Sequence, residues 1–197
     1  MPPDLPIPAN KRGKIAPVKL AHVVLRTGDA KRLVQWYRTV LEAETALANG
    51  LQHFLTYDEE HHRIAIAQLP GVDHAPDRVT TGLEHFAFTY ASADDLFATY
   101  ERLKRESITP YWTINHGPTL SMYYRDPDGN QVELQIDLFD TVEATNAWFA
   151  QSDFAMNPIG VKFDPDDLIQ RYRSGEAPER LFSRPIIDAS RVVSQFL

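Results

Sequence analysis

Cysteine is absent from this chain of 197 residues. That absence excludes disulfide bonds, thiolate metal sites, iron–sulfur clusters and cysteine nucleophiles. Any metal ion would therefore be held by histidine, aspartate or glutamate side chains. A chain without cysteine also fits a reducing compartment, so we expect a cytoplasmic protein.

Basic residues are few, because 20 lysines and arginines face 27 aspartates and glutamates, for a net charge of -7. Proteins that bind duplex nucleic acid normally carry a basic surplus or stripe, so we expect no nucleic-acid partner. No apolar run approaches the roughly 20 residues that span a bilayer, so we expect no membrane partner. Hydrophobic residues make up 43% of the chain, which is enough to build a folded core.

An internal repeat follows a proline-rich N-terminal arm over residues 1–16. Residues 19–41 align with residues 82–104, and His22 then falls on His85. Each copy begins with a β-rich run, continues through a helix-capping residue and then shows apolar residues at helical spacing. The capping residues are Asp29 and Ser92.

Three further short strands are predicted in each copy, so that each copy has the order β-α-β-β-β. These strands are expected at 43–48, 51–57 and 62–68, and at 109–114, 119–125 and 130–136. The DPDGN segment at 126–130 favours a tight turn between the last two.

The predicted fold class is α+β. One β-α-β-β-β unit cannot bury both faces of its sheet, so two should pack together. We expect two tandem βαβββ modules, at 17–77 and 78–139, forming one open mixed β-barrel around a metal site. A mostly helical C-terminal extension should follow at 140–197. Within it we expect a short helix at 141–151, a loop at 157–160, a capped helix at 164–172 and a terminal helix at 186–196. The arm and the extension offer contact surface for a homo-oligomer.

Three residues are candidate metal ligands. His22 and His85 occupy matching positions in the two copies, which would place two imidazoles near the axis between the modules. Strand alternation puts Glu133 with Gln131 and Gln135, opposite an apolar face, so the carboxylate points into the concave side of the sheet. Two histidines and one carboxylate form the ligand set of non-haem Fe(II) oxygenases, and Zn(II) accepts the same set. Ligand identity alone leaves both metals open.

Three more residues could supply acid–base chemistry. His62 lies in a predicted strand, His116 lies between strands, and Tyr123 alternates onto one face with Ser121. Each alone is readily explained as structural, but beside the three ligands they predict a pocket with proton-transfer groups. The remaining histidines, His53, His61 and His74, are interpreted as surface residues.

Over about residues 17–140 the sequence resembles the vicinal oxygen chelate superfamily. Within it, the chain is similar to one-domain type I extradiol catechol dioxygenases of the biphenyl-2,3-diol 1,2-dioxygenase kind. The segments that carry the resemblance are AHVVLRT, EEHHRIAIA, GLEHFAF and NHGPTLSMYYRDPDGNQVELQ.

The resemblance implies a ring-cleaving enzyme that inserts both atoms of dioxygen into a catechol, with cleavage next to the two hydroxyls. It also implies an Fe(II) centre, with Mn(II) as the alternative metal, held by His22, His85 and Glu133. By the same resemblance, His62 is the acid–base residue, and His116 and Tyr123 contact the substrate oxygen.

Two alternatives stay open within the same superfamily. One is a metal-dependent lyase or isomerase of the glyoxalase type, which would need a fourth ligand on the last strand of the first module. The apolar pattern sets Ala65 near the position of Glu133, so this ligand is expected to be missing. The other alternative is a metal-free small-molecule-binding relative, which would not need the three ligands.

Overall fold

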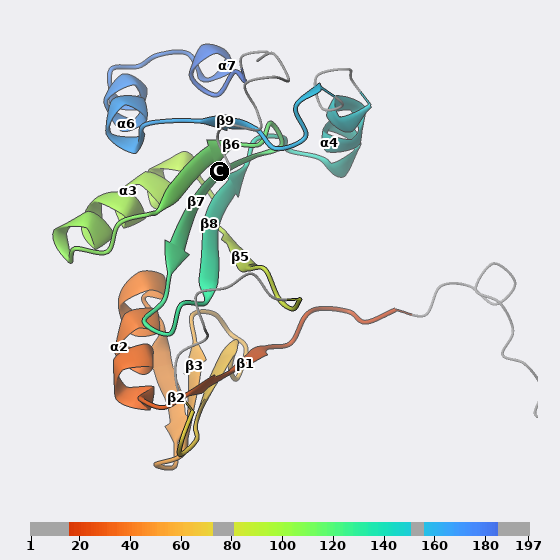
Figure 1. Cartoon of the computed structure of the whole chain (residues 1–197). Coiled ribbons are helices and arrows are strands. Elements are labelled where there is room, and N and C mark those ends of the chain that lie inside the picture. The colour runs from red at the N-terminus through yellow and green to blue at the C-terminus, as the bar shows by residue number, and fades with distance from the viewer. Residues whose placement is uncertain (1–15, 73–80, 151–155, 185–197) are drawn as a thin grey trace, which may run out of the picture.

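The computed structural model describes residues 16–72, 81–150 and 156–184. Over these residues the chain forms two mixed β-sheets with helices packed beside them, which confirms the α+β class (Figure 1). Most of the N-terminal arm and the predicted terminal helix at 186–196 lie outside the described residues. Among the helices that are described, none is long and apolar enough to cross a membrane.

The first module has the predicted β-α-β-β-β order. Its elements are β1 (Val23–Thr27), α2 (Ala30–Leu41), β2 (Glu44–Ala48), β3 (Gln52–Thr56) and β4 (Ile64–Gln68). The sheet has the order β1-β4-β3-β2, in which β1 and β4 are parallel and the other pairs are antiparallel.

The second module repeats this arrangement. Its elements are β5 (Phe86–Thr89), α3 (Ala93–Arg105), β6 (Trp112–Asn115), β7 (Thr119–Arg125) and β8 (Gln131–Asp137). Its sheet has the order β5-β8-β7-β6-β9, and β5 pairs with β8 in parallel as β1 does with β4.

The C-terminal extension supplies the fifth strand of the second sheet. It contains α4 (Val142–Phe149), β9 (Val161–Lys162), α6 (Pro165–Arg173) and α7 (Pro178–Leu181). The predicted helices at 141–151 and 164–172 are confirmed. The sequence analysis missed β9, which pairs antiparallel with β6, because two residues are too few to show an alternating pattern.

The predicted helix caps explain where α2 and α3 begin. The Asp29 side chain accepts a hydrogen bond from the Arg32 backbone N–H at 3.1 Å, and Ser92 Oγ accepts one from the Asp95 backbone N–H at 3.2 Å. Each bond satisfies an N–H that has no partner within its helix. The apolar side chains then recur toward the sheets, and Leu33 and Leu96 are fully buried.

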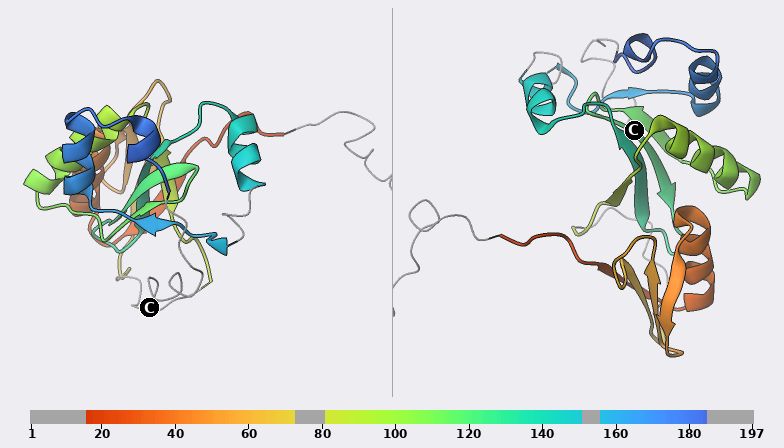
Figure 2. Two further views of the ribbon diagram at one scale, coloured as in Figure 1. Left: turned by 90° about the horizontal axis from the view of Figure 1, so that it is seen from above. Right: turned by 180° about the vertical axis from the view of Figure 1, so that it is seen from behind.

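The two modules are joined through helices and one turn rather than through shared strand pairing, as far as the described strands show. The Tyr37 hydroxyl of α2 donates to Asp126 Oδ2 in the β7–β8 turn at 2.9 Å, and this hydrogen bond is buried. Arg102 of α3 donates to the backbone carbonyls of Thr39 and Val40 at the end of α2. Helices α2 and α3 therefore lie on one side of the molecule, and α4 lies on the other (Figures 1 and 2).

Candidate active site

The centre of the candidate site is a contact between His85 and Glu133. His85 directly precedes β5. Glu133 lies on β8, the parallel neighbour of β5, and is opposite Ala87 of β5. His85 Nε2 lies 3.0 Å from Glu133 Oε2, and Glu133 is only 5% exposed. The predicted alternation of β8 is confirmed, because Val132 and Leu134 point into the core on the opposite face.

The spacing of these two donor atoms fits a metal centre. Two ligands in neighbouring positions of an octahedral cation, each about 2.1 Å from it, lie about 3 Å apart. A buried carboxylate also requires a positively charged or hydrogen-bonding partner, because an isolated buried charge is costly. His85 and Glu133 are therefore suited to hold two positions of one cation.

Tyr123 and His116 lie next to this pair. Tyr123 on β7 is directly opposite Glu133 on β8, and its ring contacts the His85 ring edge-on at 5.3 Å between centroids. His116, in the turn after β6, places Nε2 3.0 Å from the Tyr123 hydroxyl oxygen. The second module thus brings together four of the six predicted site residues.

Burial keeps both Tyr123 and His116 neutral. Burial raises the pKa of Tyr123 far above its usual range, and the negative charge of Glu133 adds to this shift. Burial also lowers the pKa of His116, although the carbonyl of Ile159 and the Glu133 carboxylate oppose the shift. A neutral phenol beside a neutral imidazole can donate or relay a proton without first changing the charge of the site.

The other two predicted residues form a separate pair on the first module. His22 precedes β1, and its ring lies 4.4 Å from that of His62, centroid to centroid. The prediction that His62 lies within a strand is wrong, because β4 begins at Ile64 and His62 sits in the turn before it. Phe54 packs edge-on against the His62 ring at 5.0 Å, and this contact holds the imidazole at the sheet surface.

The pKa of His62 is lowered by burial first, and then by the neighbouring imidazoles of His22 and His61. His61 Nδ1 also lies 2.6 Å from His62 Nδ1, so one of the two nitrogens donates to the other. A histidine with a lowered pKa is available as a proton acceptor near neutral pH.

The described structure does not bring His22 to the His85–Glu133 pair. Across residues 16–72, 81–150 and 156–184, no three histidine or carboxylate side chains lie close enough to hold a metal ion. We refer to His22 with His62 as the first half-site, and to His85, Glu133, Tyr123 and His116 as the second half-site. His22 as third ligand stays a prediction.

Strand register places Ala65 where a fourth ligand would be. Ala65 lies opposite Val24 on β1, as Glu133 lies opposite Ala87 on β5, and Val24 and Ala87 are equivalent in the repeat. A methyl group cannot coordinate a metal, so the first module carries no counterpart of Glu133 on this strand.

Sequence reasoning missed two neighbours of the second half-site. Trp112 lies opposite Tyr123 in the β6–β7 register, and its ring packs on the tyrosine ring at 4.7 Å between centroids. Pairing the predicted strands 109–114 and 119–125 across their turn could have found this tryptophan. The carbonyl of Ile159, which accepts from His116 Nδ1, has no sequence signal because it is a backbone group.

Apart from the contact of His61 with His62, the other described histidines belong to neither half-site. His61 is exposed and His53 is partly exposed, in line with the surface interpretation, and His74 lies outside the described residues.

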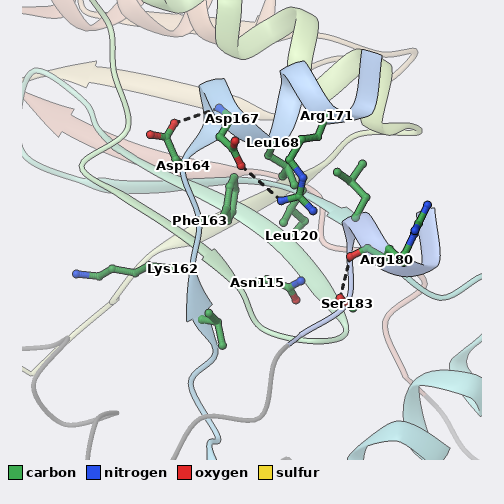
Figure 3. A pocket seen from close by; sticks show the side chains of 12 residues that line it. Asn115, Leu120, Lys162, Phe163, Asp164, Asp167, Leu168, Arg171, Arg180 and Ser183 are labelled. Atoms are coloured by element: carbon green, nitrogen blue, oxygen red, sulfur yellow. Dashed lines mark hydrogen bonds and ion pairs between the residues drawn. The ribbon is translucent and has the colours of Figure 1, made fainter. Parts of the chain in front are cut away.

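A hollow of about 400 Å³ lies between β6, β7 and the C-terminal extension (Figure 3). Its described lining includes Asn115, Leu120, Phe163 and Leu168, and none of the six predicted site residues. It is therefore distinct from the candidate active site.

Comparisons with known proteins place the chain in a family. Residues 19–134 match the sequence model of the glyoxalase/bleomycin resistance protein/dioxygenase superfamily. Two similar proteins from Rhodococcus globerulus are biphenyl-2,3-diol 1,2-dioxygenase 2 and biphenyl-2,3-diol 1,2-dioxygenase 3. The first is 40% identical over 83% of this chain and 86% of its own length, and the second is 42% identical over 84% and 88%.

A solved structure supports the fold. The fosfomycin resistance protein FosX from Mesorhizobium loti is 18% identical, with a TM-score of 0.51 over 66% of this chain and 99% of its own. At that identity the likeness concerns the fold alone. With the family match spanning both modules, the chain belongs to the glyoxalase/bleomycin resistance protein/dioxygenase superfamily.

Proposed function

We propose that this protein is an extradiol ring-cleaving dioxygenase that acts on catechol-type aromatic diols such as biphenyl-2,3-diol. The observation that carries the proposal is the His85–Glu133 contact beside the Tyr123–His116 pair. Relatives named biphenyl-2,3-diol 1,2-dioxygenases, at 40% and 42% identity, support the same activity.

In this proposal His22, His85 and Glu133 hold one Fe(II) ion. When bound, this metal would supply open coordination positions at which a catechol and dioxygen can be brought together. The fit rests on the donor types and on the 3.0 Å between His85 Nε2 and Glu133 Oε2. Because Ala65 has no donor atom in its side chain, β4 supplies no fourth ligand at this position.

The protein side chains manage protons and orientation. His62 accepts a proton from a catechol hydroxyl, for which its lowered pKa suits it. Tyr123 stays protonated, and its hydroxyl oxygen accepts a hydrogen bond from a substrate hydroxyl while His116 orients that group. The Trp112 ring packs on the Tyr123 ring and limits its movement.

The test is an assay of the iron-loaded protein with a panel of monocyclic and bicyclic catechols, followed by absorbance of the yellow ring-fission product. We expect turnover only in air, and binding without turnover under anaerobic conditions. Oxygen-independent conversion of a thiohemiacetal would instead favour the glyoxalase-type alternative. Purified protein that neither retains nor takes up a metal would favour the metal-free binding alternative.

The three-ligand centre requires the first and second half-sites to meet. In a homo-oligomer the two half-sites could come from one chain or from two, and a mixing experiment distinguishes these cases. A His22→Ala chain and a Glu133→Ala chain each lack one ligand. Refolded together, they regain intact centres if half-sites from two copies meet. They stay inactive if each centre is built within one chain.

A further inference from the structure

His116 belongs to the second module, but residues of the C-terminal extension hydrogen-bond its side chain and its backbone. His116 Nδ1 hydrogen-bonds the carbonyl oxygen of Ile159, and Nε2 faces the Tyr123 hydroxyl at 3.0 Å. A carbonyl oxygen can only accept, so the hydrogen of this contact lies on Nδ1. In the neutral imidazole Nε2 is then the acceptor, and Tyr123 is the donor.

The Ile159 carbonyl is held by a compact loop built around Asn157. The Asn157 side chain accepts from the backbone N–H groups of Ile159 and Gly160, at 3.2 and 2.9 Å, and donates to the Gly160 carbonyl at 2.8 Å. Asn157 is only 3% exposed, so these bonds are shielded from water. Its amide therefore fixes the backbone on both sides of the carbonyl that His116 meets.

The loop lies very close to β6, the strand that ends at Asn115, directly before His116. A Cβ added to Gly160 would lie 2.4 Å from the Asn115 carbonyl oxygen, and Gly160 has a φ of 133°, in the region that favours glycine. Val161 directly after it pairs with Asn115 in the β6–β9 ladder. Only glycine allows the loop to lie this close to β6.

Arg184 links the Asn157 loop to His116 through two hydrogen bonds. Its guanidinium donates to the His116 carbonyl at 2.7 Å and to the Asn157 carbonyl. On the other side of the same strand, Asn115 donates to the Phe182 carbonyl at 2.9 Å and lines the hollow shown in Figure 3. Residues 157–184 thus hold both Asn115 and His116, and all of them lie beyond the family match at 19–134.

We propose that Asn157, through the Ile159 carbonyl, fixes His116 as the Nδ1–H tautomer, so that its Nε2 accepts the hydrogen of the Tyr123 hydroxyl. Asn157 is then a positioning residue for the hydroxyl that the proposed function assigns to substrate binding. The consequence for catalysis rests on that proposed function, but the tautomer itself does not.

A preset tautomer matters because the Tyr123 hydroxyl has a choice of acceptors. Its single hydrogen can go either to His116 Nε2 or to the carboxylate of Glu133, which also hydrogen-bonds it. An Nε2–H imidazole would donate to the phenol and turn its hydrogen toward Glu133. An Nδ1–H imidazole accepts that hydrogen and leaves the carboxylate free for other partners.

The experiment reads the tautomer directly by long-range ¹H–¹⁵N correlation spectra of the metal-free full chain labelled with ¹⁵N-histidine, above the pKa of His116. A His116→Gln spectrum assigns the resonance. We expect Nδ1–H in the wild type and a mixture or reversal in Asn157→Ala. Asn157→Asp keeps the acceptor for both N–H groups and should restore most of the wild-type pattern. Asn130→Ala, in the distant β7–β8 turn, is the matched control and should leave His116 unchanged.

An Nε2–H wild type overturns the proposal, as does an Asn157→Ala spectrum identical to that of the wild type. If Asn157→Ala does not fold, Arg184→Met decides, because it removes the clamp and keeps the side-chain stem. Hydrogen retained fully on Nδ1 in that variant overturns the proposal too.

Steady-state kinetics of ring cleavage provide a second test. We expect kcat for ring cleavage to fall about tenfold in Asn157→Ala with a smaller change in KM, and Asn157→Asp to recover most of it. A wild type that cleaves no catechol would refute the proposed function and leave the tautomer result standing.

Discussion

His85 Nε2, directly before β5, lies 3.0 Å from Glu133 Oε2 on the parallel neighbour β8. The carboxylate is almost fully buried, yet the imidazole is partly exposed, so the pair faces solvent from the histidine side. This arrangement fits a cation that reaches a buried carboxylate from the exposed histidine side.

The first prediction concerns these ligands. His85→Ala and Glu133→Ala should each remove stoichiometric iron and ring-cleavage activity together, because each deletes a donor atom from the centre. His22→Ala should do the same. Metal analysis of protein purified without chelator, paired with the catechol assay, measures both effects.

His53→Ala is the control for these variants, since His53 lies on β3 and contacts none of the proposed ligands among the described contacts. It should keep its iron. Full iron retention in His85→Ala and Glu133→Ala would refute the ligand assignment.

The second prediction separates metal binding from proton transfer. His62→Phe keeps a ring beside Phe54 but loses the nitrogen that accepts a proton, so iron and catechol binding should persist while kcat falls by about 10²–10⁴-fold. Stopped-flow binding under anaerobic conditions and turnover in air measure the two properties separately. His53→Phe, at a partly exposed position on β3, should stay within a few-fold of wild type. Unchanged turnover in His62→Phe would remove this residue from the mechanism.

Local patterns predicted most of the fold because local interactions determine it. The alternation of β8 gave the inward direction of Glu133, and the caps Asp29 and Ser92 marked where two helices begin. Both signals lie within a few residues of the feature that they predict.

Long-range features could not be predicted in this way. The contact of His116 with the Ile159 carbonyl joins a side chain to a backbone group 43 residues away, and a backbone carbonyl is identical in every residue. The repeat aligned His22 with His85, but alignment of two modules does not determine how their sheets face each other.

The third prediction uses the register of Ala65. Ala65→Glu adds a carboxylate at the position equivalent to Glu133, so the metal should be retained while catechol turnover falls by at least about tenfold, because one open coordination position is then filled. Ala65→Leu controls for added bulk without a donor atom. Metal content, turnover and the circular dichroism of both variants test this, and equal losses in the two variants would assign the effect to bulk.

The last prediction concerns the joint between the modules. Tyr37 donates to Asp126 Oδ2 at 2.9 Å, and Asp126 also accepts from the backbone and side chain of Asn130. Tyr37→Phe removes one buried hydrogen bond to a carboxylate and should lower the free energy of unfolding by about 1–2 kcal/mol. Tyr124→Phe is the matched control, because the Tyr124 hydroxyl meets only the weakly accepting Met122 sulfur, at 3.9 Å, among its described hydrogen-bond contacts.

Asp126→Ala should lower the free energy of unfolding more than Tyr37→Phe, since it also leaves the Tyr37 hydroxyl buried without an acceptor. In the double variant the losses should fall short of additivity, because both changes break the same bond. Urea unfolding of the four variants measures this coupling. Additive losses would mean that the Tyr37–Asp126 contact does not stabilise the joint between the modules.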